Sequence, residues 1–442
     1  MSLLPQRSNR LPGLTVEQGD PLSALHERSL GVGEMLAVEF QLAAYWLDEV
    51  PSITLVALYL QTPTGMQLAV TDQMINVAES SVEAQFKAWA RQGNCAIVEV
   101  GAALPLVPVY IAKPWGREIW FSGIERRGLS GVRSATFPGS AESSASAQGV
   151  TPIPWLQAVM PAAALGGPGD LVLLKILDPV PEPVTGDLYF ELHQRKREVY
   201  VVTHVDAQAW PDGVGYIRYG FNPDKIAAAG SPVEFRRQYL TAVQAYERTR
   251  RELDMRSTTP DEPLLERERR EREQMDSFCA LKPLRAGDVV RVPLRLPHSL
   301  LHGVRTIEFQ TPVYERMILS FAQRVLTQQH WDTEAALATM LLRPPAEEPV
   351  AVVIDEEGVL VQRIVDFDEF SVLRFSLEAG SSVLLPASAA VRVGMVATGQ
   401  VSISGQVLRS EEAILMPRGG TQNTMLDAST QGAVFLLAIP AH

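Results

Sequence analysis

Residues 186–200 read GDLYFELHQRKREVY, two short apolar runs on either side of a charged turn. This pattern is typical of two β-strands joined by a turn. Glu191 and His193 stand two apart on the first predicted strand, so their side chains leave the same face. A hairpin at the charged turn would bring Glu198 beside His193. The stretch therefore predicts two carboxylates and one imidazole on one sheet face, a set that suits a divalent metal of the zinc type.

A second stretch offers a fourth ligand. Gly287-Asp288 predicts a turn before a strand, and His298 follows the end of that strand. His298 would complete the set, since zinc binds both imidazole nitrogen and carboxylate oxygen. A Glu-x-His pair alone is a weak signal, because a histidine on a strand is usually an ordinary hydrogen-bonded residue. His204 shares the strand face of Glu198 and is expected to support the ligands from behind.

Short β-forming runs separated by Pro and Gly turns fill most of the chain after residue 105, which is typical of a β-sandwich or barrel. One apolar stripe at helical spacing interrupts them, formed by Phe235, Tyr239, Val243 and Tyr246. A further helix is expected over residues 321–342. The chain is therefore predicted to be mainly β, with an N-terminal α+β block at 1–104, a β-domain from 105–233 and 279–343, a helical insertion at 234–278 and a C-terminal β-domain at 350–442.

The composition limits the possible functions. The chain has 442 residues, a formal net charge of −12 and only two cysteines, Cys95 and Cys279. Its negative charge argues against a general nucleic-acid binder, which relies on excess Lys and Arg. No apolar stretch approaches the roughly 18–20 residues that span a bilayer, and two cysteines cannot build a disulfide framework. We therefore expect a cytoplasmic protein without a secretory signal, a nucleic-acid partner or a membrane span.

Two segments resemble the motifs of the cupin superfamily. Residues 186–198 have the form G-x4-E-x-H-x4-E, and residues 287–298 have the form G-x5-P-x-R-x2-H. Both motifs stand in their usual order, with the region between them enlarged by the helical insertion. The superfamily has His where this chain has Glu191, and Gly where it has Arg295. The resemblance implies two cupin-like β-sandwich (jelly-roll) domains.

Within the cupins, the chain resembles the type I phosphomannose isomerases, which are zinc-dependent and carry a helical insertion and a second β-domain. The similar stretches follow the order of that family: Pro114-Trp115-Gly116, Glu191-Leu-His193, Lys196-Arg-Glu198-Val-Tyr200, Pro297-His298 with Gly303 and Glu308, and Tyr314-Glu315-Arg316. Glu191 replaces the metal-binding Gln of the family. The resemblance covers about residues 105–442, so the N-terminal block has no recognised counterpart.

The resemblance implies an aldose-ketose isomerase that interconverts mannose 6-phosphate and fructose 6-phosphate through an enediol, with a sugar phosphate as its partner. It places Zn²⁺, or another divalent metal, on Glu191, His193, Glu198 and His298. Its candidate catalytic residues are Lys196 as the base, Arg316 as the holder of the enediolate or phosphate, and Glu308 as a ligand-orienting or proton-shuttling group. Its candidate substrate contacts are Lys113, Trp115 and Arg117.

Two other interpretations stay open at this point. The chain could be a non-catalytic cupin that binds a sugar or sugar phosphate. It could also be a cupin enzyme of other chemistry, such as an oxygenase that holds Fe(II) on His193, Glu198 and His298. The identity of the bound metal and the turnover of a hexose phosphate separate these alternatives. The C-terminal domain contains no histidine except His442, so no second site of this type is expected there.

Overall fold

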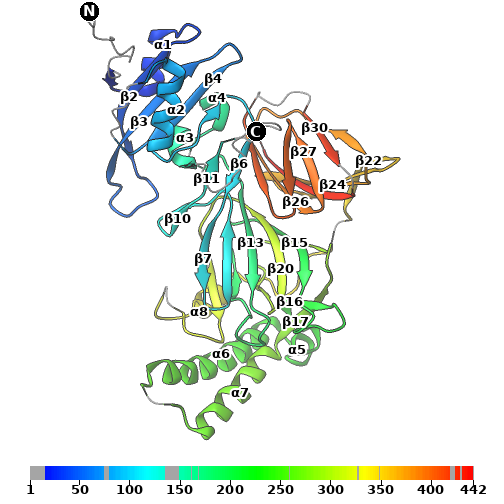
Figure 1. Cartoon of the computed structure of the whole chain (residues 1–442). Helices are drawn as coiled ribbons and strands as arrows, with labels where there is room; N and C mark the ends of the chain where they lie inside the picture. The colour runs from blue at the N-terminus through cyan, green and yellow to red at the C-terminus, as the bar shows by residue number, and fades with distance from the viewer. Residues whose placement is uncertain are drawn as a thin grey trace, which may run out of the picture. The chain divides into compact units, whose positions relative to one another are not determined.

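The computed structural model describes residues 15–73, 79–134, 149–160, 162–167, 169–257, 259–325, 328–347, 349–418, 424–428 and 431–441. The chain divides into two compact units (Figure 1). Unit 1 comprises Met1–Val109, Trp120–Val172 and Val352–His442, and unit 2 comprises Tyr110–Ile119 and Leu173–Ala351. Among the helices that the structure describes, none combines the length and the hydropathy needed to span a bilayer.

Unit 2 is built on two β-sheets that share a core. The six-stranded sheet has the order β18 (Val289–Val292), β15 (Glu198–Val205), β20 (Val304–Gln310), β13 (Leu173–Pro179), β8 (Gly116–Trp120) and β7 (Val109–Lys113). The five-stranded sheet has the order β17 (Cys279–Leu284), β16 (Gly215–Phe221), β19 (His298–Leu300), β14 (Phe190–Leu192) and β21 (Met317–Ser320). Side chains from both sheets, such as Val202 and Leu300, form one buried cluster between them.

The helical insertion covers the other face of the five-stranded sheet. It contains α5 (Pro223–Ala228), α6 (Pro232–Met255) and α7 (Glu262–Asp276), and the short α8 (Thr333–Leu337) follows later in the chain. The predicted apolar stripe of α6 is fully buried, and it packs with Phe190, Leu192 and Phe221 of the sheet. Because side chains alternate along a strand, burying Phe190 and Leu192 beneath the helices turns Glu191 toward the opposite sheet. The insertion thus fixes the direction in which a site residue points.

Unit 1 contains an α+β part and a second sandwich. A five-stranded sheet is formed by β1 (Val16–Gln18), β2 (Met35–Ala43), β3 (Ser52–Gln61), β4 (Met66–Thr71) and β5 (Val98–Glu99), in that order. The helices of this unit are α1 (Pro21–Arg28), α2 (Val82–Gln92), α3 (Ile153–Val159) and α4 (Ala162–Leu165). Phe86 and Trp89 of α2 are buried against this sheet. A two-stranded ribbon pairs β9 (Ile124–Glu125) with β10 (Gly128–Leu129).

The second sandwich of unit 1 pairs a large sheet with a small one. The nine-stranded sheet has the order β12 (Val150–Pro152), β11 (Gly131–Arg133), β6 (Leu104–Val107), β29 (Ala413–Met416), β26 (Arg392–Thr398), β31 (Ala433–Pro440), β24 (Phe370–Leu377), β23 (Val359–Asp366) and β22 (Ala351–Glu356). The four-stranded sheet has the order β25 (Ser382–Leu384), β30 (Met425–Ala428), β27 (Gln400–Ile403) and β28 (Gln406–Arg409). Phe375 and Phe435 of the large sheet share a core with Val401 and Leu426 of the small one.

The predicted fold class is confirmed: the chain is mainly β, with two sandwiches, a helical insertion and an N-terminal α+β block. The predicted domain limits stay a prediction, although β12, β11 and β6 belong to one sheet with β29 of the C-terminal region, and β6 is the strand that pairs with β29. The helix expected over residues 321–342 is wrong, because among the described residues of this range only Thr333–Leu337 is helical. Phe321 instead packs on Tyr189, and the backbone N–H of Trp331 donates to Glu247, so tertiary contacts override the local pattern.

A buried arginine joins the end of the helical insertion to the sandwich. Arg218 Nη2 lies 3.0 Å from Asp187 Oδ2 and 3.1 Å from Asp276 Oδ2. Arg218→Ala would leave the buried Asp187 and the partly buried Asp276 without their shared cation, so we expect it to lower the free energy of unfolding by about 3 kcal/mol. Urea denaturation measures this change. Arg237→Ala is the control, because Arg237 only pairs with Glu234 on the exposed surface of α6; an equal loss in both variants would contradict the prediction.

Candidate metal centre and active site

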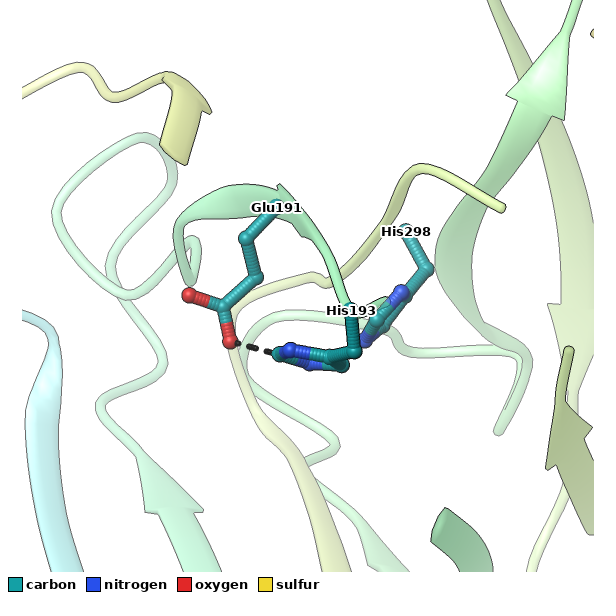
Figure 2. A group of neighbouring side chains, drawn as sticks. All are labelled: Glu191, His193 and His298. Carbon is teal, nitrogen blue, oxygen red and sulfur yellow. Dashed lines mark ion pairs between the residues drawn. The ribbon is translucent and has the colours of Figure 1, made fainter. Parts of the chain in front are cut away.

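Three side chains that could hold a metal ion meet inside the unit 2 sandwich (Figure 2). Glu191 and His193 come from the end of β14, and His298 begins β19. The two strands pair antiparallel with Glu191 opposite His298, and one ligand atom from each of the three residues lies within 4.8 Å of the others. Both histidines are almost fully buried, and their ring centroids lie 5.2 Å apart. The arrangement is a compact set of nitrogen and oxygen donors.

Glu198 reaches this group from the facing sheet. Its Oε1 lies 2.7 Å from His298 Nε2 and 3.3 Å from His193 Nε2. The Tyr200 hydroxyl donates to the same oxygen at 2.8 Å, and Lys196 Nζ lies 2.6 Å from Oε2. Burial would raise the pKa of Glu198, but the charges of Lys196 and His193 hold it well below its ordinary value. Glu198 is therefore a buried carboxylate that stays ionised.

The structure thus brings the four predicted ligands together, but not through the predicted hairpin. β14 pairs with β19 and β21, whereas β15 pairs with β18 and β20 in the other sheet. The charged segment between His193 and Glu198 crosses from one sheet to the other. The contact between Glu198 and the two histidines therefore forms between two facing sheets, whereas a single sheet was predicted.

The protonation of the histidines suits metal binding. Nδ1 of His193 lies 2.8 Å from the Glu315 carbonyl oxygen, and Nδ1 of His298 lies 3.1 Å from that of Leu296. A carbonyl only accepts, so each Nδ1 carries a proton, and a ring in its neutral form then keeps a lone pair on Nε2. Among the described residues, neither Nε2 atom nor Glu191 Oε2 makes a hydrogen bond. Burial lowers the pKa of His193, which favours its neutral form. Burial also acts to lower the pKa of His298, but the nearby Glu198 carboxylate outweighs it and raises that pKa. These residues fit a divalent cation.

A chain of buried charges extends from this group along the six-stranded sheet. Lys175 Nζ lies 3.1 Å from Glu308 Oε2 and 4.0 Å from Glu118 Oε1, and Lys113 Nζ lies 3.1 Å from Glu118 Oε1. Burial raises the pKa of Glu308 to about 8; Lys175 opposes this rise and Glu198 adds to it. Glu308 therefore exchanges its proton near neutral pH.

Lys175 and Glu118 were not predicted from the sequence as residues of this site. Lys175 stands inside the apolar run of β13, directly opposite Glu308 of β20. A lysine that interrupts an otherwise buried strand is itself a signal, because a buried ammonium needs a carboxylate partner. Glu118 gives no comparable signal, since β8 is short and begins beside a turn.

A small cavity connects these groups. Its lining includes Trp115, Glu118, Lys175, Tyr189, Glu191, Lys196, Tyr200, His298, Glu308 and Arg316. Its volume is about 30 Å³, which is room for roughly one water molecule. The Arg316 guanidinium lies over the Tyr189 ring at 4.6 Å, and its Nη1 is 3.8 Å from Glu191 Oε2. The Arg316 cation thus lies directly beside Glu191, the candidate ligand that stands where the similar isomerases have Gln.

The three predicted substrate contacts have different surroundings. Trp115 is buried in the core and lines the cavity. Lys113 and Arg117 are not among the described residues that line it. Lys113 is buried against Glu118, and the half-exposed Arg117 pairs with Asp178, at 2.6 Å from Nε to Oδ2. Only Trp115 therefore reaches the cavity in this structure.

The expected supporting role of His204 is wrong. Its side chain is exposed, whereas Glu198 on the same strand is fully buried. The pairing of β15 with β20 shifts register between Val202 and His204. A bulge of this kind ends the strict alternation of side chains, so His204 leaves the face that Glu198 occupies.

The chain matches solved protein structures, whereas the sequence comparisons found nothing. No protein-family model and no curated protein sequence matches the chain. Among solved structures, the mannose 6-phosphate isomerase from Bacillus subtilis is 14% identical with a TM-score of 0.54, over 76% of this chain and 99% of that one. The apo mannose 6-phosphate isomerase from Salmonella typhimurium is 12% identical with a TM-score of 0.52, over 77% and 99%. At this identity the likeness shows a shared fold.

The donor set predicts tight binding of one divalent metal ion per chain. Zn²⁺ binding to the chelator-stripped protein measures it by calorimetry, and Co²⁺ absorption reports the ligand geometry. His298→Ala should weaken Zn²⁺ binding by more than the roughly 10–100-fold that supporting residues contribute. His204→Ala is the control, since this exposed histidine should leave the affinity unchanged. Equal affinities of wild type and His298→Ala would contradict the assignment of the site.

Proposed function

We propose that this chain is a metal-dependent aldose-ketose isomerase that interconverts mannose 6-phosphate and fructose 6-phosphate through an enediol. One observation carries the proposal: Glu191, His193, Glu198 and His298 converge beside a cavity that is also lined by proton-exchanging and cationic side chains. The shared fold with mannose 6-phosphate isomerases supports it independently.

The reaction moves a proton between C1 and C2 of the sugar and stabilises negative charge on the sugar oxygens. A divalent metal, when bound, supplies Lewis acidity toward those oxygens. Glu308 lines the cavity, and a group with a pKa of about 8 is suited to giving and taking protons near neutral pH. Lys196 also lines the cavity and is our candidate for the base that removes the C–H proton.

The cationic residues hold the developing charge. Arg316 lines the cavity, and its guanidinium fork matches the paired oxygens of an enediolate or a phosphate. Lys175 provides a second cation, with its Nζ 3.1 Å from Glu308 Oε2. Trp115 is proposed to pack on the sugar, and the assignment of Lys113 and Arg117 to the substrate stays a prediction.

The cavity volume adds a requirement for substrate entry. A hexose phosphate is much larger than the about 30 Å³ available. The substrate can bind only if lining side chains move, and Arg316 is the partly exposed one that contacts Glu191. In this proposal Arg316 moves away from Glu191 to admit the substrate, while Glu191 stays among the residues that would hold the metal.

A coupled assay that converts mannose 6-phosphate to fructose 6-phosphate tests the proposal on chelator-stripped protein with Zn²⁺ added back. We expect turnover that depends on the metal and disappears in His298→Ala. Glu308→Gln should lower kcat by about 10²–10⁴-fold, the usual contribution of a general acid or base. His204→Ala is the matched control and should keep full activity.

One result would overturn the isomerase assignment. If the protein binds one metal ion per chain but turns over no mannose 6-phosphate with any divalent metal, the site does not perform this reaction. Sugar-phosphate binding without turnover would then favour the non-catalytic cupin. Selective binding of Fe(II) would favour a cupin enzyme of other chemistry.

A further inference from the structure

Tyr200 is a buried tyrosine that contacts one of the candidate metal ligands. It stands two residues after Glu198 on β15, so both side chains leave the same face of the strand. Its ring packs in the core of the unit 2 sandwich with Leu177 and Leu300, and it also lines the small cavity. Its hydroxyl donates to Glu198 Oε1 at 2.8 Å. Tyr200 therefore acts on the site through a carboxylate, and no step of the proposed reaction uses it.

The two oxygens of Glu198 have different neighbours. Nε2 of His298 and Nε2 of His193 approach Oε1, at 2.7 and 3.3 Å, whereas Lys196 Nζ lies 2.6 Å from Oε2. A cation held by the two imidazole nitrogens therefore meets Oε1. The ammonium beside Oε2 repels a second cation from that oxygen, because like charges interact strongly in a buried environment. Glu198 thus offers one oxygen to a metal ion and keeps the other for Lys196.

Tyr200 restrains the rotation that would exchange these two oxygens. The terminal torsion of a glutamate side chain is broad, so a carboxylate without partners turns easily about its last bond. Lys196 restrains this rotation less, because its stem is flexible and because it is the candidate base of the proposed reaction. The Tyr200 ring is rigid and buried in the core, so its hydroxyl holds Oε1 at a fixed position. Tyr200 is therefore a positioning residue for Glu198.

We propose that Tyr200 restricts Glu198 to binding the metal through Oε1 alone and thereby makes the site selective for zinc over harder divalent ions such as Mn²⁺. With one oxygen from Glu198, the four candidate ligands supply four donor atoms, the number that zinc prefers. Mn²⁺ prefers octahedral, oxygen-rich sites, so a second oxygen from Glu198 favours it. The inference rests on the metal dependence of the proposed function, and it does not depend on which sugar phosphate reacts.

Tyr200→Phe tests the inference, because it removes the hydroxyl and keeps the buried ring. Calorimetric titration of the chelator-stripped full chain with Zn²⁺ and with Mn²⁺ measures the two affinities, and Co²⁺ absorption reports the ligand geometry. We expect Zn²⁺ binding to weaken by about 10–100-fold, the usual effect of losing a partner behind a metal ligand. Mn²⁺ binding should weaken less, so the preference for zinc narrows, and the Co²⁺ spectrum should change.

Tyr246→Phe is the matched control. Tyr246 is a fully buried tyrosine of α6 whose hydroxyl donates to Glu268 Oε1, also at 2.8 Å, and it does not line the cavity. Each variant loses one hydrogen bond from a tyrosine to a glutamate, so each should lose a similar amount of stability. Only Tyr200→Phe should change the metal affinities. An equal loss of Zn²⁺ affinity in both variants is a general structural effect and overturns the proposal.

The remaining outcomes separate this inference from the isomerase assignment. Unchanged metal affinities and an unchanged Co²⁺ spectrum in Tyr200→Phe overturn the role of Tyr200, even if the wild type turns over mannose 6-phosphate. A narrowed zinc preference in Tyr200→Phe supports that role even if the wild type turns over no sugar phosphate, in which case only the isomerase assignment fails. Absence of metal binding to the wild type overturns both.

Discussion

The contact of Glu198 with two buried imidazoles is the interaction on which the rest of unit 2 depends. A fully buried carboxylate is costly unless opposite charges and hydrogen bonds compensate it. Lys196, Tyr200, His193 and His298 all supply such compensation, and they come from both sheets of the sandwich. The two sheets must therefore pack in one register to bring these groups together. A divalent cation among the same donors would compensate the buried Glu198 carboxylate more strongly.

The helical insertion acts on the site through the same strand that carries two ligands. Phe190 and Leu192 belong to the core beneath α6, while Glu191 between them faces the interior of the sandwich. The direction of Glu191 is thus determined by apolar burial on the opposite side of β14. A loss of the insertion would expose that apolar core and release the constraint on Glu191. The helical insertion, which contributes no candidate ligand, therefore helps to set the geometry of the candidate metal site.

The convergence of the four candidate ligands could be predicted from sequence because a Glu-x-His pair and a Pro-His pair have short, characteristic spacings. The pairing of β14 and β15 could not be predicted, since the segment 193–197 is equally compatible with a hairpin and with a crossing between sheets. His204 was misplaced because a β-bulge leaves no mark in the residue pattern. Arg295 shows the opposite case: the cupin motif has Gly there, and the backbone indeed has φ = +66°, a region that favours glycine. The motif therefore predicts a left-handed backbone at this position. Arg295 adopts it at a cost in free energy, because its Cβ is disfavoured there.

The charges around the cavity explain why a metal and a phosphorylated substrate would belong together. The described residues of the site and its extension include four carboxylates and four cations, namely Glu118, Glu191, Glu198, Glu308, Lys113, Lys175, Lys196 and Arg316. The pKa of about 8 favours a protonated Glu308 at neutral pH, and the set then has one net positive charge. A divalent metal adds two positive charges to a buried environment, where uncompensated charge is costly. A phosphate dianion supplies the same number of negative charges. Charge balance therefore favours joint occupancy by the metal and a dianionic ligand over occupancy by the metal alone.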